Sequence, residues 1–332
     1  MTSLNHTFCV APMLDWTDRH CRFFLRQISR HALLYTEMVT TNAIVHADRQ
    51  KLLRFDAGEH PVALQLGGAH ADELARCAEI GEQFGYREIN LNCGCPSDRV
   101  QEASFGALLM KDPDRVARGV AAMRGATSLP VTVKSRIGVD DSEEYPFLRA
   151  FVETVAAAGC DTFIVHARKA WLKGLSPKEN REVPPLNYEV VLRLKQDYPQ
   201  LKVILNGGLK TLEECHEHLK SLDGVMLGRE VYENPYILAE VDRQFFGATT
   251  AAPTREQVVH RLMPYVAREL ERGVHLHHIT RHILGLYRGR AGGRAFRRFL
   301  SENAGLHDAG TDVIEMALLE VETPLLPHAA AA

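Results

Sequence analysis

The stretch Glu88-Ile89-Asn90-Leu91-Asn92-Cys93-Gly94-Cys95-Pro96 combines an apolar, alternating run with a turn, and the rest of the chain repeats this arrangement. Its first half predicts a short buried strand. Gly94 and Pro96 predict a tight turn directly after it, because glycine reaches backbone angles closed to other residues and proline fixes the chain. The thiol of Cys95 is therefore expected at the exit of a strand. A buried, inert cysteine is the common alternative, and a zinc site is disfavoured because no second Cys or His pair lies at ligand spacing.

Apolar, β-rich runs of similar length recur along the chain and alternate with amphipathic helical segments. Strand alternating with helix predicts a parallel sheet with right-handed crossovers, and eight such units in about 240 residues predict an α/β fold closed into a (β/α)8 TIM barrel. An open doubly wound sheet is disfavoured, because no G-x-G-x-x-G follows the first run. The runs are Phe8–Ala11, Leu33–Thr36, Pro61–Leu66, Glu88–Leu91, Val131–Lys134, Thr162–His166, Lys202–Asn206 and Gly224–Leu227.

The strand pattern stops near residue 253 and helical periodicity replaces it. Four segments, Arg255–Glu271, His275–Tyr287, Arg294–Glu302 and Asp312–Leu319, predict a small C-terminal α-helical bundle. We therefore expect two domains, a catalytic barrel over 1–248 and a helical domain over 253–332.

Composition places few limits on the function. The 332 residues are 45% hydrophobic and 24% charged, and no apolar run approaches the roughly 20 residues of a membrane span. The N-terminus lacks the pattern of a signal peptide, and seven scattered cysteines favour a reducing compartment, so we expect a cytoplasmic protein without a membrane or metal partner. Length and a net charge of −3 suit a monomer.

Polar residues collect at the C-terminal ends of all eight runs, where the barrel fold places its active sites. Two of these ends, Asn206-Gly207-Gly208 and Gly228-Arg229, have the form of a phosphate site, because glycines let backbone N–H groups approach an anion and Arg229 can add a charge-assisted bond. Two glycine-capped turns are the alternative. A single phosphate at this face indicates a mononucleotide such as FMN.

The other strand ends suit a flavin ring. Gln65 can bond its amide edge, and Lys134 can stabilise the negative charge that develops on reduction. His166 can hold the ring or the phosphate, while Pro12 and Met13 offer an apolar floor.

Together these segments resemble the tRNA-dihydrouridine synthase family, and within it the A subgroup. The resemblance extends over residues from about 8 to 300. It is carried by Ala11-Pro12-Met13-Leu14-Asp15-Trp16-Thr17-Asp18-Arg19, Tyr35-Thr36-Glu37-Met38, Ala63-Leu64-Gln65-Leu66-Gly67-Gly68, Asn90 to Ser97, Val133-Lys134-Ser135-Arg136-Ile137-Gly138, His166-Ala167-Arg168, Asn206-Gly207-Gly208 and Gly228-Arg229.

The resemblance implies an FMN barrel that uses NADPH to reduce a uridine in the D-loop of tRNA. It implies Cys95 as the acid and Asn92 beside the substrate base, and the segment 169–186 resembles the A subgroup, whose targets are U20 and U20a. The implied flavin contacts are Pro12, Met13, Leu14, Gln65, Lys134, His166, Asn206, Gly207, Gly208, Gly228 and Arg229.

The chemistry of the reaction agrees with an acid at Cys95. Reducing the 5,6 double bond of uracil needs a hydride at one carbon and a proton at the other. A thiol with a reference pKa of about 8.5 is mostly protonated at neutral pH, and burial favours the neutral form further. We therefore assign Cys95 as a general acid.

A uridine in folded tRNA must leave its stack, which needs a basic surface to hold the rest of the RNA. The window 272–298 contains seven arginines and no acidic residue, which favours phosphate contact over a merely solvated face. Arg294 and Arg297 can share one helix face. A second set of expected RNA contacts, on the loop after strand six, is Lys178, Glu179, Arg181 and Glu182.

Two other functions remain open from the sequence. One is an FMN barrel that acts on a free pyrimidine, in the manner of dihydroorotate-type dehydrogenases. The other is an RNA-binding factor that retains a flavin without turnover.

Overall fold

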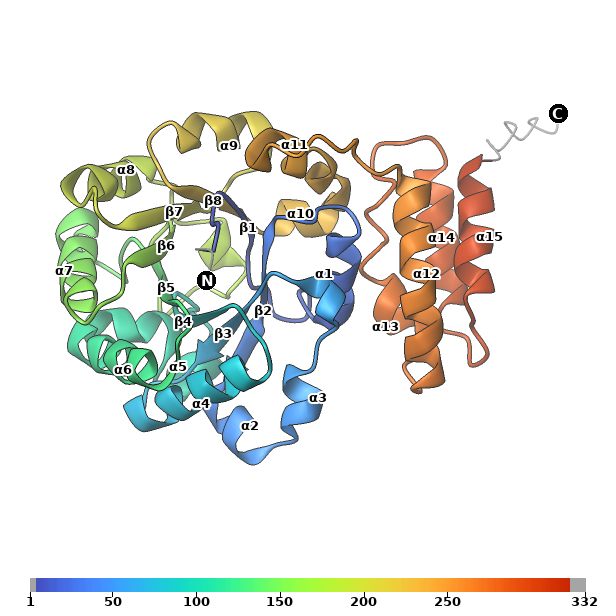
Figure 1. The fold of residues 1–332 in the computed structure, drawn as a ribbon. Coiled ribbons are helices and arrows are strands. Elements are labelled where there is room, and N and C mark those ends of the chain that lie inside the picture. The colour runs from blue at the N-terminus through green and yellow to red at the C-terminus, as the bar shows by residue number, and fades with distance from the viewer. Residues whose placement is uncertain (1–3, 323–332) are drawn as a thin grey trace. The chain divides into compact units, whose positions relative to one another are not determined.

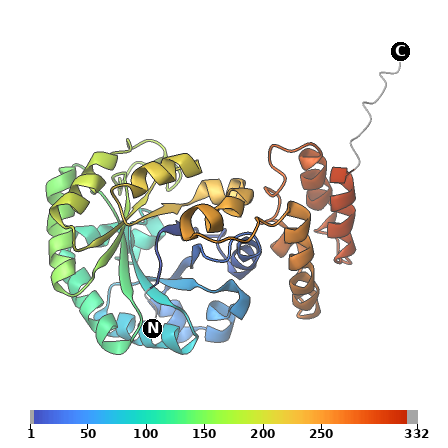
Figure 2. The same cartoon turned by 45° about the horizontal axis from the view of Figure 1, so that its top comes forward.

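Eight parallel strands form a closed barrel in sequence order in the computed structural model, which describes residues 4–322. This confirms the TIM-barrel prediction, and Figures 1 and 2 show the strands as an inner layer surrounded by helices. The strands are β1 (Phe8–Val10), β2 (Leu33–Thr40), β3 (Val62–Gly67), β4 (Glu88–Cys93), β5 (Val131–Arg136), β6 (Thr162–His166), β7 (Lys202–Asn206) and β8 (Gly224–Leu227).

The helices between the strands begin at residues that favour helix starts. Asp112 accepts a hydrogen bond from the backbone N–H of Arg115 ahead of Pro113, and Thr211 forms a capping box with Glu214. These helices and short 3-10 segments are α2 (Thr41–His46), α3 (Arg49–Leu53), η1 (Ala57–Glu59), α4 (Ala71–Gln83), α5 (Asp98–Glu102), η2 (Gly106–Lys111), α6 (Pro113–Ala126), α7 (Glu144–Ala157), η3 (Glu179–Arg181), α8 (Tyr188–Asp197) and α9 (Leu212–Leu219).

Alternate residues of each strand occupy the barrel interior, and this period of two places polar groups on the axis side of β4. Gln65 of β3 lies opposite Asn90 of β4, which lies opposite Thr132 of β5. Part of the interior is an apolar cluster made of Cys9, Ala11, Leu33, Tyr35, Ala63, Ile164, Ile204 and Met226.

The chain divides into two compact units. The first contains residues up to Thr17 together with Ala32–Gly228, and the second contains Asp18–His31 together with the chain from Arg229 onward. The second unit consists of α1 (Arg19–Arg26), α10 (Arg229–Glu233), η4 (Pro235–Glu240), α11 (Val241–Phe246), α12 (Arg255–Glu271), α13 (Leu276–Thr280), α14 (Gly293–Asn303) and α15 (Asp312–Glu322).

This division differs from the sequence boundary at 248–253, since the first helix after β1 joins the C-terminal helices. His20 of α1 lies 2.7 Å from the hydroxyl of Tyr265 of α12, and Phe23 stacks on the same ring. The boundary between a catalytic and an RNA-binding domain stays a prediction, and its outer ends at 1–3 and 323–332 lie outside the described residues.

One helix prediction was wrong. The segment His275–Tyr287 is helical only over α13, and the chain then continues through turns. Gly285 lies so close to the carbonyl of Glu233 that an added Cβ would be 2.6 Å from its oxygen. Packing against that backbone therefore overrides the local helical pattern. Within residues 4–322 no helix has the length and apolar character needed to cross a membrane.

Candidate active site

The turn after β4 is held by a single amide side chain. The Oδ1 atom of Asn92 accepts hydrogen bonds from the backbone N–H groups of Gly94 at 3.1 Å and Cys95 at 2.9 Å. Cys95 is the one partly exposed cysteine among the seven, and its Sγ lies 3.5 Å from Oγ of Ser97. The strand-exit thiol expected from the sequence is therefore present, and its backbone position is fixed.

Gln65 is buried beside this turn and is bonded at both ends of its amide. Its Nε2 donates to Oδ1 of Asn90 at 2.7 Å, and its Oε1 accepts from Nδ2 of Asn92 at 2.8 Å. Asn92 is 9% exposed, and within the described residues only one of its two Nδ2 hydrogens is bonded. The expected contact between Asn92 and a base thus has one donor available.

Lys134 and Asn206 form a second polar pair, from β5 and β7. Lys134 Nζ donates to Asn206 Oδ1 at 2.9 Å, and Asn206 Nδ2 donates to the carbonyl of Met226 at 2.8 Å. Burial first, and the charge of Arg136 second, lower the pKa of Lys134 to about 7. The amine is therefore poised between its two protonation states at neutral pH.

His166 lies directly against Gly207. A Cβ on Gly207 would lie 2.5 Å from the ring Cδ2 of His166, and the φ of +111° at this residue also requires glycine. Tyr188 Oη donates to the carbonyl of Gly207 at 2.9 Å. Gly208 also has a positive φ, +77°, and a Cβ there would lie 2.4 Å from Cδ1 of Leu186, so both residues of the β7 exit require glycine.

Positive charge gathers around His166. Burial lowers its pKa well below the usual range, and Arg136, Lys134, Arg168 and Arg181 all lower it further, so the ring is neutral. Arg136 is 4% exposed and donates to the carbonyl oxygens of Gly94 at 3.2 Å, Lys169 at 3.1 Å and Asn180 at 2.9 Å, none of which carries a charge. A cluster of cations held in this way favours an anionic ligand.

The β1 exit contributes apolar side chains. Pro12 and Met13 are partly buried, and Leu14 is 66% exposed. A Cβ on Gly228 would lie 3.7 Å from Sδ of Met13, which is an ordinary contact, so the packing does not require glycine at this position. Arg229 follows it as the first residue of α10, in the second unit.

The predicted RNA contacts after β6 form an exposed group around η3. Lys178, Glu179, Arg181 and Glu182 are all exposed, and the carboxylate of Glu179 accepts from the backbone N–H of Ser176 at 2.8 Å. Of this group, Arg181 acts electrostatically on His166, which places it near the cation cluster.

Asn180, in the middle of that group, was missed by the sequence reasoning. It is fully buried, and its Nδ2 donates to the carbonyls of Trp171 and Leu175 while its Oδ1 accepts from the N–H of Trp171 at 2.7 Å. It thus fixes the shape of the loop from within. An asparagine among alternating charges was the available signal, but burial cannot be read from that pattern.

Five of the seven arginines in the window 272–298 differ in whether they pair with an acid. Three form ion pairs with acids outside the window: Arg272 with Glu269 at 2.6 Å, Arg281 with Asp18 at 2.7 Å, and Arg288 with Glu233 at 3.5 Å. The inference that the window lacks acidic partners was therefore wrong for these three. Arg294 and Arg297 are exposed on α14 and have no ion pair or hydrogen bond with another described residue.

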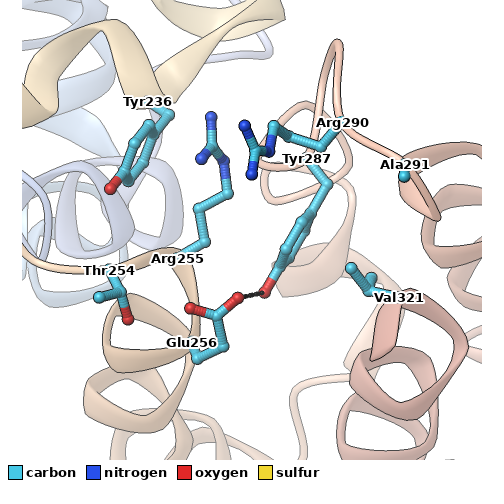
Figure 3. Close-up of a pocket in the computed structure, with 8 residues that line it drawn as sticks. All are labelled: Tyr236, Thr254, Arg255, Glu256, Tyr287, Arg290, Ala291 and Val321. Carbon is cyan, nitrogen blue, oxygen red and sulfur yellow. Dashed lines mark hydrogen bonds between the residues drawn. The ribbon is translucent and has the colours of Figure 1, made fainter. Parts of the chain in front are cut away.

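A pocket of about 400 Å³ lies in the same unit, where the start of α12 meets the chain before α14. Figure 3 shows the guanidinium groups of Arg255 and Arg290 near each other between two tyrosine rings. The guanidinium carbon of Arg255 lies 3.6 Å from the ring centre of Tyr236. Burial lowers the pKa of Arg255, and the charge of Arg290 contributes in the same direction. The sequence reasoning did not single out this pair.

Comparisons with known proteins decide the family. The family model described as "Dihydrouridine synthase (Dus)" matches residues 9–322. The chain belongs to the dihydrouridine synthase family. A relative from Vibrio cholerae serotype O1, named tRNA-dihydrouridine(20/20a) synthase, is 58% identical over 313 residues, or 94% of this chain and 95% of the relative. A relative of the same name from Pseudomonas aeruginosa is 59% identical over 299 residues, or 90% of each chain.

The solved structures agree on the fold of this dihydrouridine synthase family member. Morphinone reductase is similar with a TM-score of 0.50 at 12% sequence identity, covering 76% of this chain and 88% of that one. This likeness supports the barrel architecture alone. Within the described residues no three His, Cys, Asp or Glu side chains are grouped so that they could hold a metal ion.

Proposed function

We propose that this chain reduces the 5,6 double bond of uridines 20 and 20a in the D-loop of tRNA to give dihydrouridine, with FMN as cofactor and NADPH as reductant. The observation that carries the proposal is the thiol of Cys95, which is partly exposed and fixed at the exit of β4 beside Gln65 and Lys134. Relatives that are 58% and 59% identical carry the name of this activity.

The residues at the strand ends fit a flavin mononucleotide. Gly207 and Gly208 place backbone without a Cβ at the exit of β7, the cations around His166 favour a phosphate, and the exposed Leu14 is an apolar contact for a ring. Pro12, Met13, Gln65, Lys134, Asn206, Gly208, Gly228 and Arg229 complete the proposed set. Reduced FMN, when bound, supplies the hydride to one carbon of the double bond.

The residues of the chain perform the rest of the reaction. Cys95 holds the proton that the second carbon receives, and Asn92 holds the turn so that the thiol faces the base. Lys134 supplies a positive charge where negative charge develops. Because the neighbouring cation Arg136 is fixed by three carbonyl groups, it contributes charge without changing position.

Replacing the thiol tests this assignment. We expect Cys95→Ala to retain FMN and its reduction by NADPH while dihydrouridine formation slows by about 10²- to 10⁴-fold, the usual contribution of a general acid. Cys93→Ala is the matched control, because Cys93 is a fully buried cysteine two residues away. Full dihydrouridine formation by Cys95→Ala, measured by mass spectrometry of digested tRNA, would remove the assignment.

We further propose that tRNA is held by Arg294 and Arg297 of α14, which have no acidic partner among residues 4–322, and by the pair Arg255 and Arg290. Two guanidinium groups beside tyrosine rings suit an RNA phosphate with its adjacent sugar or base. The group Lys178, Glu179, Arg181 and Glu182 is the proposed contact near the reacting base. A monomer in the cytoplasm is the proposed working form, which size-exclusion chromatography with light scattering and cell fractionation would test.

Comparing substrates separates this function from its rivals. A dihydrouridine synthase reduces unmodified tRNA and leaves free uridine unchanged, whereas an enzyme for free pyrimidines does the reverse. An RNA-binding factor without turnover would bind tRNA and form no dihydrouridine with NADPH.

A further inference from the structure

A continuous chain of hydrogen bonds runs inside the barrel from the base of β4 to the turn that carries Cys95. Its members come from β3, β4 and β5, and all are buried. Glu88 Oε1 accepts from Thr132 Oγ1 at 2.6 Å, Thr132 Oγ1 accepts from Asn90 Nδ2 at 2.8 Å, Asn90 Oδ1 accepts from Gln65 Nε2 at 2.7 Å, Gln65 Oε1 accepts from Asn92 Nδ2 at 2.8 Å, and Asn92 Oδ1 accepts from the N–H groups of Gly94 and Cys95.

Such a polar chain is unusual for the inside of this fold. TIM-barrel interiors are mostly filled by bulky branched side chains, yet β4 presents Glu88, Asn90 and Asn92 in three successive inward layers. Glu88 and Thr132 are both 0% exposed. A buried polar group without a partner costs about 1–3 kcal/mol, so the members depend on one another for satisfaction.

The groups at the two ends of this hydrogen-bond series fix the direction in which every bond donates. Backbone N–H groups at Gly94 and Cys95 can only donate, so Asn92 must turn its oxygen toward them. A carboxylate at Glu88 can only accept, so Thr132 must donate to it. Every amide between these ends then has one orientation in which all bonds form. If any one of these amides were flipped, a donor would lie opposite a donor, or an acceptor opposite an acceptor.

Glu88 is held in place by two further partners that are not on the path to Cys95. Tyr35 Oη donates to its Oε1 at 2.7 Å, and His6 Nε2 lies 2.6 Å from its Oε2. The carboxylate is therefore a fixed anchor at the base of the barrel. Tyr35 offers a natural comparison, because it donates to the same oxygen as Thr132 but is not part of the hydrogen-bond series that leads to Cys95.

We propose that Glu88 and Thr132 are positioning residues for the proposed reduction: through Asn90, Gln65 and Asn92 they set the position of the Cys95 turn from the opposite end of the barrel. The inference rests on the proposed function, since it gives Cys95 its role. Neither residue touches the reacting atoms.

Isosteric variants test this arrangement in the full-length holoenzyme. Thr132→Val keeps the side-chain shape and removes the hydroxyl that joins Asn90 to Glu88, and Thr132→Ser keeps a hydroxyl at this position. Tyr35→Phe removes a buried hydrogen bond to the same carboxylate that does not lead to Cys95. Glu88→Gln, which keeps the shape of the anchor but can also donate, is the second variant. Two quantities are compared, amide hydrogen exchange of the segment 92–97 and the single-turnover rate of tRNA reduction at saturating tRNA, and the KM for tRNA is measured alongside them.

We expect Thr132→Val and Glu88→Gln to speed exchange in this segment and to slow the turnover rate by about tenfold, or about 1.4 kcal/mol at the barrier, with the KM for tRNA unchanged. Thr132→Ser should restore both quantities, and Tyr35→Phe should leave both near wild type. If Thr132→Val matches Tyr35→Phe in exchange or in rate, or if Thr132→Ser fails to restore them, the inference is overturned. Hydrogen exchange needs no substrate, so it tests the hydrogen-bond series even if the wild-type protein reduces no tRNA. That result would remove the proposed function and not this inference.

Discussion

At the scale of single residues, Lys134 has the most informative environment in the candidate site. Burial lowers its pKa to about 7, from an ordinary value near 10.5. Its amine bonds Asn206 on one side, and the nearby Arg136 opposes its protonation. A bound anion would reverse that balance, because a negative charge favours the protonated amine. If the proposed flavin contact of Lys134 holds, we expect cofactor binding to favour the protonated amine.

This environment predicts a pH dependence of stability in the flavin-free protein. Between pH 7 and the unfolded pKa near 10.5, the unfolded chain binds a proton at Lys134 that the folded chain does not, so its contribution makes stability rise with pH. Lys134→Met lacks the penalty of a buried charge. Its Tm advantage over wild type should be largest below pH 7 and should shrink as pH rises toward 10.

Differential scanning fluorimetry of flavin-free protein measures this difference. Lys51→Met is the control, because Lys51 is exposed on α3 and its substitution should give a pH-independent Tm difference. A Lys134→Met advantage that stays constant or grows with rising pH would contradict the prediction.

The sequence predicted the strand-end residues because the barrel rule says where functional side chains collect. It did not predict the series of hydrogen bonds from Glu88 to the Cys95 turn, since that series depends on which residues of β3, β4 and β5 lie opposite one another. Register between strands is set by the whole barrel. The alternation in Glu88-Ile89-Asn90-Leu91-Asn92 was visible, but it indicates an inward polar face and not its partners.

At the scale of elements, α14 is a helix with two distinct sides. Ala295, Phe296 and Leu300 are buried, while Arg294 and Arg297 are exposed three residues apart without a partner among the described residues. The sequence located this helix correctly and overextended α13, because a period of 3.6 does not show where a glycine must approach another backbone. Ion pairs made across the sequence were equally invisible.

The exposed side of α14 predicts a salt-dependent affinity for tRNA. Arg294→Ala with Arg297→Ala should weaken binding and reduce the slope of log affinity against log salt by about one unit for each lost phosphate contact. The matched control is Arg272→Ala with Arg288→Ala, because these arginines are exposed but already paired with acids. Fluorescence anisotropy with labelled tRNA at several salt concentrations measures both, and equal slopes for the two double variants would rule out α14 as a phosphate contact.

At the scale of the whole molecule, the second unit is built from two separate parts of the chain. Its α1 precedes β2, and its other helices follow β8. The packing of Phe23 on Tyr265, whose ring centres lie 3.9 Å apart, joins these parts. A cut at the proposed domain boundary therefore leaves α1 without the helices that cover it.

A truncated chain tests this consequence. The fragment 1–248 should lose about 3 kcal/mol or more of unfolding free energy, since one buried aromatic side chain alone contributes about 1.5–3 kcal/mol. It should also bind the dye ANS through the uncovered face of α1. The fragment 1–322, which keeps every helix of the second unit, is the control. A fragment 1–248 that is monomeric, dye-free and as stable as the full chain would contradict the prediction.

The split origin of the second unit also affects how the protein is made. The hydrogen-bonding partners His20 and Tyr265 are 245 residues apart, so a ribosome adding about 5–20 residues per second needs about 12–50 seconds between them. During that interval the nascent α1 has emerged while the helices that shield it do not yet exist. Synthesis of this chain therefore includes a period in which the apolar face of an early amphipathic helix is without the residues that later bury it.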